Sequence, residues 1–205
     1  MDILESHLGK MGGVLWSFAN GYDETPVRTP EEESPIKSIG NSVTTPRDML
    51  NNEDVKTVLF VLSESVGARL RKHGFRAQTV EIYVRDNELE HFIRQRKLPF
   101  STDSAYEIAS AAYSLFTENY QWNRPVRSVG VRGVNLKLAG FAEQLDLFTD
   151  DDFRKKMAKA DRTVDEIRSH FGYYAVQRGI LVRDPGLSHL NAEEDHVSHP
   201  VGFIR

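Results

Sequence analysis

The sequence predicts an α+β fold in which a four-stranded antiparallel sheet carries two helices on one face. Stretches in which apolar and polar residues alternate indicate strands, and stretches with apolar spacings of three and four indicate helices. Between residues 36 and 140 these stretches follow one another in the order βαββαβ. A helix before this region and a helical tail after it complete the predicted organisation.

The region opens with a strand and a long helix. Residues 36–45 are rich in β-branched side chains, and Pro46 ends this strand. Either Asn51 or Asn52 can cap the helix that follows, which runs to His73. The apolar side of that helix is predicted to enter the core and consists of Val55, Val58, Leu59, Leu62, Val66 and Leu70.

A β-hairpin comes next. Val80, Ile82 and Val84 alternate with polar residues, so one face of the second strand is buried and the other is in water. The turn falls at Asp86-Asn87, and the third strand ends with Arg94-Gln95-Arg96-Lys97.

The second helix and the last strand complete the sheet. Ser104 and Glu107 have the spacing of a capping box for a helix that runs towards Tyr120. The core side of this helix carries Ile108, Ala112, Leu115 and Phe116. Residues 126–136 return as the fourth strand, with a bulge predicted at Gly133. Both helices then cover a single face, and the opposite face stays open.

The flanking parts differ from this domain in composition. Residues 1–21 predict one helix with an apolar stripe, and residues 22–35, with three prolines and three consecutive glutamates, predict a linker. Residues 36–140 form the domain itself, and residues 141–205 form a tail. In the tail we expect a helix from Asp152 to Phe171, which could pack or self-associate, followed by a loosely ordered end.

The charge is distributed unevenly along the chain. The whole sequence has a net charge of −4, but residues 36–140 contain fifteen Lys or Arg against eleven Asp or Glu, so the middle is +4 and the flanks together are −8. A positively charged central region of this kind can carry a phosphate-binding face or simply a solvated surface. The absence of cysteine excludes disulfides and thiolate sites, which fits a cytoplasmic protein, and no apolar run is long enough for a membrane span.

Clustered cations indicate where such a face would lie. Arg94-Gln95-Arg96-Lys97 offers several cationic groups within a short reach, as phosphate contacts require. The alternative is a charged edge strand that prevents unwanted pairing. Arg85, Arg127 and Arg132 favour phosphate binding, because they fall at solvent-side or end positions of neighbouring strands and can follow a DNA backbone without reading bases.

A short apolar peptide follows the last strand. Gln144-Leu145-Asp146-Leu147-Phe148 is flanked by acidic residues, so we expect it to be exposed as a binding anchor, although short apolar runs more often belong to a core. Burial of each large apolar side chain contributes roughly 1.5 to 3 kcal/mol, so the peptide should bind a partner at about micromolar strength.

The sequence offers no catalytic or metal site. It lacks a glycine-rich phosphate loop, a nucleophile elbow and a helical His-Glu metal pair. His189, His196 and His199 have no common zinc spacing and are read as tail histidines. The adjacent carboxylates Asp23-Glu24 and Asp165-Glu166 are read as surface charge.

Several stretches resemble the C-terminal part of Y-family translesion DNA polymerases, the DNA polymerase IV and UmuC group. Lys37 to Asp48, with the sequence KSIGNSVTTPRD, resembles the opening of their little-finger domain. Residues 19–23 resemble the end of their thumb, residues 69–74 the first little-finger helix and residues 94–98 its third strand. Residues 161–179 are similar to a tail found in Gram-positive members.

The resemblance implies a DNA-binding fragment of a longer polymerase. It implies contacts to primer-template DNA from the outer face of the sheet. The predicted contacts then include Lys37 and Thr44 in addition to residues 94–97, Arg85, Arg127 and Arg132. In this family a Gln-Leu-x-Leu-Phe peptide docks on the β sliding clamp, and Gln144, Leu145, Leu147 and Phe148 match it around Asp146. The palm, the fingers and the thumb's helix-hairpin-helix glycines have no counterpart here, so we expect no catalysis and no cofactor, with Mg²⁺ used by the parent enzyme. The alternative is an adaptor that binds the clamp or a polymerase partner without touching DNA.

Overall fold

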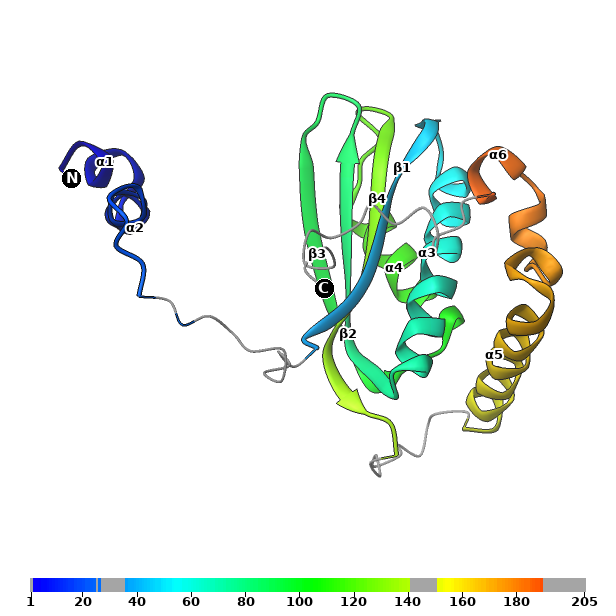
Figure 1. The fold of residues 1–205 in the computed structure, drawn as a ribbon. Coiled ribbons are helices and arrows are strands. Elements are labelled where there is room, and N and C mark those ends of the chain that lie inside the picture. Colours follow the sequence, from blue (N-terminus) through cyan, green and yellow to red (C-terminus); the bar gives the residue numbers. More distant parts are fainter. Residues whose placement is uncertain (1, 25, 27–35, 141–150, 190–205) are drawn as a thin grey trace. The chain divides into compact units, whose positions relative to one another are not determined.

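Four antiparallel strands form one sheet in the order β1-β4-β2-β3 (Figure 1). The computed structural model describes residues 2–24, 26, 36–140 and 151–189. The strands are β1 (Ser38–Met49), β2 (Phe75–Asp86), β3 (His91–Thr102) and β4 (Val126–Leu138). Residues 1–35 and 36–205 form two separate units, and the sheet belongs to the second.

The helices α3 (Asn52–Lys72) and α4 (Ala105–Asn119) cover one face of the sheet (Figure 1). The predicted order βαββαβ and the α+β class are therefore confirmed. Asn51 caps α3, because its side chain accepts a hydrogen bond from the Asp54 amide at 2.9 Å. Gly74, with a φ of 68°, follows the end of α3 in the left-handed conformation that glycine adopts without strain.

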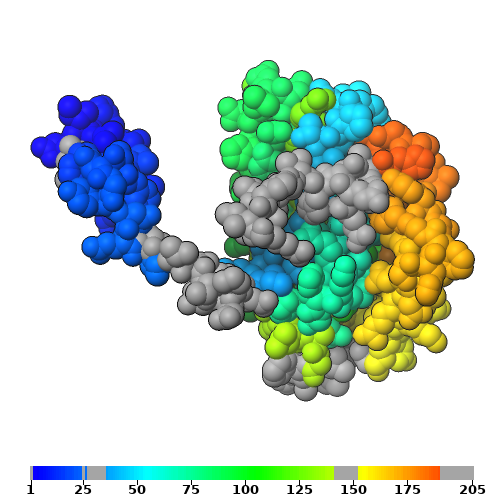
Figure 2. Space-filling view, viewed as in Figure 1, coloured from blue at the N-terminus to red at the C-terminus, as the bar shows by residue number. Residues whose placement is uncertain are grey.

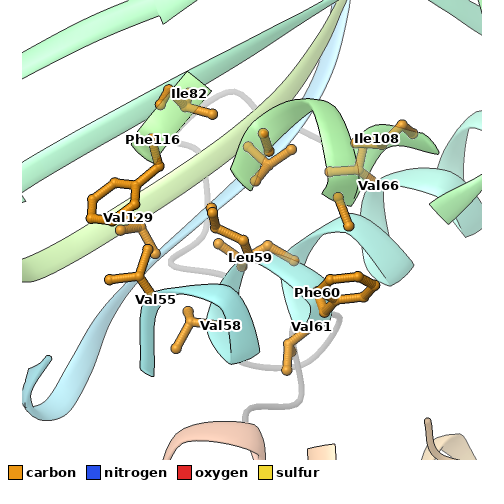
Figure 3. Packing of buried hydrophobic residues seen from close by; sticks show 14 of the residues in the cluster. Val55, Val58, Leu59, Phe60, Val61, Val66, Ile82, Ile108, Phe116 and Val129 are labelled. Carbon is orange, nitrogen blue, oxygen red and sulfur yellow. The ribbon is translucent and has the colours of Figure 1, made fainter. Parts of the chain in front are cut away.

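The core lies between the sheet and these two helices. Figure 3 shows Leu59 of α3 and Phe116 of α4 packed with Ile82 of β2 and Val129 of β4. All four side chains are buried, and so is every apolar residue that the helical spacings placed in the core. Burial of each such side chain contributes roughly 1.5 to 3 kcal/mol, so this cluster is the main source of stability in the domain.

A third layer packs on the side of α3 that faces away from the sheet (Figure 1). It consists of α5 (Asp151–Phe171), η1 (Tyr173–Ala175), η2 (Gly179–Val182) and α6 (Pro185–Ser188). Leu181 and Leu187 are buried in the same core cluster as α3, and Figure 2 shows this yellow-to-orange layer abutting the cyan of α3. The predicted helix is confirmed, but the expected loose order after it is wrong for residues 172–189. The compact unit that begins at residue 36 therefore contains this layer in addition to the predicted domain of residues 36–140.

Buried ion pairs attach the third layer to α3. The two carboxylate oxygens of Glu64 accept hydrogen bonds from Arg178 Nε at 2.7 Å and Arg168 Nη2 at 2.8 Å. Arg71 donates to Asp165, with Nη2 3.0 Å from Oδ1. Burial disfavours the charge of Arg71, but the hydrogen bond to Asp165 and the nearby carboxylates outweigh it and raise the pKa of this guanidinium.

The N-terminus of α4 is capped from α5, and the predicted capping box is wrong. Ser104 makes no side-chain cap, and Glu107 instead accepts a hydrogen bond from Arg154 Nε at 2.8 Å. Asp161 takes the capping role, because its Oδ2 accepts the Ala105 amide hydrogen at 3.1 Å. A carboxylate at this position satisfies a free amide and also favours the helix dipole. The third layer therefore helps to form the two-layer fold beneath it.

Two details of the sheet differ from the prediction. β1 continues past Pro46 to Met49, and its pairing with β4 shifts register between Thr44 and Met49. Gly133 is not a bulge, since the pairing of β4 with β2 runs through it without a shift. A Cβ at Gly133 would lie 2.8 Å from the Cβ of Ala77, so glycine is needed there for close packing on the core side.

The N-terminal unit is a pair of helices rather than one. α1 (Asp2–Leu8) and α2 (Lys10–Ala19) are separated by Gly9, whose φ of 58° breaks the predicted single helix. A Cβ on Gly12 would lie 2.2 Å from the carbonyl oxygen of Leu4, so the two helices contact each other at a position that only glycine fits.

Candidate nucleic-acid interface

The face of the sheet opposite α3 and α4 carries the polar half of each strand. Because Val80, Ile82 and Val84 are buried against the helices, alternate residues of β2 and their neighbours in the register point the other way. Among residues 36–140 and 151–189, every helix lies on the same side of the sheet as α3 and α4 (Figure 1). We call the other side the open face, and it includes Thr44, Thr79, Glu81, Tyr83, Arg85, Gln95, Lys97, Ser128, Gly130 and Arg132.

Small residues allow β1, β4 and β2 to pack closely at the centre of the open face. Gly130 lies opposite Ser42 in the register. A Cβ on Gly130 would lie 2.9 Å from the Cβ of Ser42 and 3.4 Å from that of Tyr83. Gly130 is buried among these neighbours, so glycine is needed there for close packing of adjacent strands.

Three cations lie on the open face in different surroundings. Arg85 Nη2 donates to Ser128 Oγ at 3.0 Å, and Ser128 in turn is 2.7 Å from the Thr44 hydroxyl. Arg132 is 56% exposed in its side chain and pairs with Glu81, with Nη1 3.4 Å from Oε1. Lys97 is exposed on β3. The open face therefore carries guanidinium, ammonium and hydroxyl groups, which are all possible hydrogen-bond donors.

Arg94 and Arg96 do not share this face, contrary to our expectation. Val80 and Ile82 point into the core, and their register partners Arg96 and Arg94 lie on the same side of the sheet, towards α4. Arg94 Nε donates to Asn119 Oδ1 at 3.2 Å, and Arg96 Nη1 donates to Ser114 Oγ at 3.1 Å. The physical reason is that consecutive residues of a strand alternate between faces, so four adjacent cationic or polar residues cannot form one surface.

Arg96 also pairs with a carboxylate of α4, Glu118. Hydrogen bonds from Ser114 and Arg96 hold the pKa of Glu118 below its ordinary value. The side chain of Glu118 is about half exposed, so this ion pair lies at the surface of the helix-covered side. The cationic charge of Arg96 is therefore locally balanced.

The remaining predicted contacts lie near the ends of strands. Lys37 is exposed immediately before β1. Arg127, near the start of β4, pairs with Asp48 at 3.2 Å between Nη1 and Oδ1. Gln95, in the middle of β3, is on the open face opposite Glu81. The structure therefore groups Thr44, Arg85 and Arg132 with Gln95 and Lys97, and leaves Lys37 and Arg127 at the margin.

Two residues of this face were not among the predicted contacts. Ser128 is the hydrogen-bond partner of both Arg85 and Thr44, and Glu81 is the carboxylate partner of Arg132. Both residues alternate with buried neighbours, Ser128 with Val129 and Glu81 with Val80 and Ile82, so their side chains point away from the helices. Only the strand order, which puts β4 between β1 and β2, shows that their side chains meet those of Thr44, Arg85 and Arg132.

The predicted clamp peptide, residues 144–148, lies outside the described residues, as do His196 and His199. His189 lies beside Tyr174, with ring centroids 5.2 Å apart. In the described ranges no three His, Asp or Glu side chains are grouped so that they could hold a metal ion. No helix in those ranges is long and apolar enough to cross a membrane.

Comparison with known proteins supports the resemblance seen in the sequence. Residues 36–147 match the family model described as the impB/mucB/samB family C-terminal domain, and this match covers the whole sheet, α3 and α4. The chain belongs to this family. The Y-family polymerase resemblance of the sequence is confirmed at this level, and residues 151–189 add a third layer beyond the matched domain.

Similar full-length proteins agree with this assignment. A protein named DNA polymerase IV from Acetivibrio thermocellus is 48% identical over 189 residues, which are 92% of this chain and 47% of that protein. A DNA polymerase IV from Moorella thermoacetica is 33% identical over 91% of the chain and 46% of its own length. DNA polymerase IV 2 of Bacillus subtilis is 36% identical over 91% of the chain and 45% of its own length. The chain spans about half the length of these relatives.

Proposed function

We propose that this chain holds primer-template DNA by its sugar-phosphate backbone, as the non-catalytic little-finger part of a translesion DNA polymerase. The observation that carries this proposal is the open face, on which Arg85, Arg132 and Lys97 lie with the hydroxyl groups of Thr44 and Ser128. Such groups recognise phosphates, and a chain whose relatives are named DNA polymerases has DNA as the natural source of phosphates.

The open face favours contact with the backbone over reading of base sequence. Reading of bases in the major groove needs a projecting helix or ribbon, whereas in residues 36–140 the helices lie on the other side of the sheet. Phosphate contacts set the position and orientation of the protein on the duplex without sequence information. This suits a polymerase that must follow any template, including a damaged one.

We further propose that residues 144–148 tether the chain to the β sliding clamp. The support is the match of Gln144, Leu145, Leu147 and Phe148 to the clamp-binding pattern of the family, together with the place of the peptide between β4 and α5 in the sequence. A lone peptide of this size binds at about micromolar strength, which allows reversible exchange of the polymerase on the clamp.

The dependence of DNA binding on salt tests the main proposal. With about five phosphate contacts, the affinity of the chain for a primer-template duplex should fall several hundred-fold between about 50 and 200 mM salt and should depend little on sequence. Fluorescence anisotropy with two unrelated duplexes measures both properties. If DNA does not bind at low salt, the chain acts as an adaptor that reaches the clamp or a polymerase partner without DNA.

Matched variants identify the face that binds. Replacement of Arg132 and Lys97 by alanine removes two cations from the open face and should reduce the slope of log affinity against log salt by about 1.8. Replacement of Arg94 and Arg96 by alanine removes two cations from the helix-covered side of the same sheet and should leave the slope unchanged. The reverse pattern would contradict binding through the open face.

A further inference from the structure

The two sides of α5 differ in their charge. The sequence of this helix is nearly balanced, with six Lys or Arg against five Asp or Glu. The fold separates these charges, because Asp161 and Asp165 point towards α3 and pair there with Arg71. Arg154 and Arg168 are also paired with carboxylates on this inward side. The inward side of α5 therefore consumes two of its carboxylates, and most of the remaining cations point the other way.

We call the opposite side of α5 its outward face. Among residues 36–140 and 151–189, no other element covers this face (Figure 1). Four cations are exposed on it against two carboxylates, which are Lys155, Lys156, Lys159 and Arg162 against Asp152 and Glu166. In the described part of this unit, no Asp or Glu oxygen lies within 4.0 Å of Lys156, Lys159 or Arg162. The outward face therefore carries a surplus of cations that are available to an anionic partner.

Exposed aromatic rings lie at the C-terminal end of the same helix. His170 comes about three turns after Lys159, so the two side chains point in the same direction. The ring of His170 is 6.3 Å from that of Phe171, which is 78% exposed. Tyr174 is 45% exposed, and its ring lies 5.2 Å from that of His189. Rings that are this open to water can stack on planar groups of a partner.

We infer that the outward face of α5, with the aromatic rings that follow it, binds single-stranded DNA. Cations attract the phosphates, and unpaired bases stack on exposed aromatic rings. A duplex keeps its bases stacked inside and an acidic peptide has none, so neither partner would use the rings in this way. From Lys156 to Phe171 the helix rises by about 22 Å, which can accompany several nucleotides.

This surface is separate from the open face. It belongs to the third layer, which packs on the side of α3 away from the sheet, and it lies outside residues 36–147 that match the family model (Figure 1). In a polymerase, the template that has not yet been copied supplies a single strand. This use rests on the proposed function, whereas the binding itself is tested on the chain alone.

Removal of two cations tests the electrostatic part. Lys156→Gln combined with Lys159→Gln should lower the affinity of the full chain for labelled oligo(dT) of about twelve nucleotides about tenfold at low salt. The slope of log affinity against log salt should fall by about 1.4, and duplex affinity should stay within about twofold. The control combines Lys56→Gln with Arg183→Gln, which removes two cations that pair with Glu53. This control should bind oligo(dT) like the parent chain.

Removal of a ring tests the stacking part. Phe171→Ala removes an exposed ring without removing charge, so it should lower oligo(dT) affinity about tenfold at an unchanged salt slope. Phe171→Trp keeps a stacking ring and should bind at least as tightly as the parent chain. Val182→Ala, which truncates an exposed apolar side chain of the same layer, is the control and should change nothing. Melting curves followed by circular dichroism show that each variant is folded.

Three results would overturn this inference. The first is oligo(dT) affinity that neither the Lys156 and Lys159 double variant nor Phe171→Ala lowers. The second is a glutamate-rich peptide that displaces oligo(dT) from the parent chain while Phe171→Ala has no effect, because the surface would then recognise an acidic protein segment. The third is loss of oligo(dT) affinity only when Arg132 and Lys97 are replaced, which would assign single strands to the open face and leave the proposed duplex binding intact.

Discussion

At the scale of single residues, the open face contains a carboxylate that opposes its proposed function. Glu81 lies in the middle of β2, and its Oε1 is 3.4 Å from Nη1 of Arg132. The ion pair holds Arg132 in place, but Glu81 also repels any phosphate that approaches this part of the sheet. The strength of DNA binding should therefore be set by the balance between these two charges and not by the number of cations alone.

Replacement of Glu81 by glutamine should strengthen DNA binding. The change removes a negative charge from the open face and keeps the shape of the side chain, so Arg132 becomes free to contact a phosphate. One unit charge at about 4 Å in water corresponds to about 1 kcal/mol, or about a fivefold gain in affinity. Anisotropy titration at about 0.1 M salt measures this gain.

Glu118→Gln is the control for this prediction. Glu118 also pairs with an arginine of the sheet, Arg96, but it lies on α4. At about 0.1 M salt the screening length is about 10 Å, so loss of a charge on the helix-covered side should change DNA affinity little. Equal gains for both variants would show that only the net charge of the chain matters.

Alternation within the strands predicted which residues of β2 and β4 face the solvent, including Arg85 and Arg132. The same rule, applied to Arg94-Gln95-Arg96-Lys97, separates Arg94 and Arg96 from the open face, although a group of consecutive cations suggests a single surface. The hydrogen bonds among Thr44, Arg85 and Ser128 could not be predicted, because they depend on the neighbour relations of three strands and not on local pattern.

At the scale of elements, α5 contributes to the fold of the domain that precedes it. Its residue Asp161 is buried, accepts the amide hydrogen of Ala105 at the start of α4, and accepts a hydrogen bond from Arg178 Nη2 at 2.7 Å. Local spacing favoured Ser104 and Glu107 as the cap, because a sequence pattern cannot show a partner 56 residues away. The cap of α4 is therefore a tertiary contact with α5, and the capping box suggested by the local sequence does not form.

Replacement of Asp161 by alanine should destabilise residues 36–189 as a whole. It removes the cap of α4 and leaves Arg178 and Arg71 without one of their acidic partners, so the free energy of unfolding should fall by about 3 kcal/mol. Urea unfolding followed by circular dichroism measures the change.

The matched control is Glu166→Ala, which removes an exposed carboxylate from the same helix. A surface change of this kind should alter the free energy of unfolding by no more than about 0.5 kcal/mol. If Asp161→Ala were equally mild, α5 would not be part of the cooperative unit, and the third layer would be an independent attachment.

At the scale of the whole molecule, the two proposed interactions use chemically different parts of the chain. The open face offers cations and hydroxyls for phosphates, whereas the peptide at residues 144–148 offers two leucines and a phenylalanine for an apolar pocket. The proposed DNA binding should weaken steeply with salt, whereas the proposed clamp binding should depend on the apolar area that is buried. The two should therefore respond independently to substitution.

Replacement of Leu147 and Phe148 by alanine should remove clamp binding and leave DNA binding within about twofold. Each side chain contributes roughly 1.5 to 3 kcal/mol when buried, so the loss of both should lower the affinity for the β sliding clamp by at least about a hundredfold. Asp146→Ala, at the position that the family pattern leaves open, should bind the clamp much as the parent chain does. Surface plasmon resonance with immobilised clamp and anisotropy with duplex DNA measure the two affinities. A variant that lost both would show that the peptide supports the DNA-binding domain instead of acting as a separate tether.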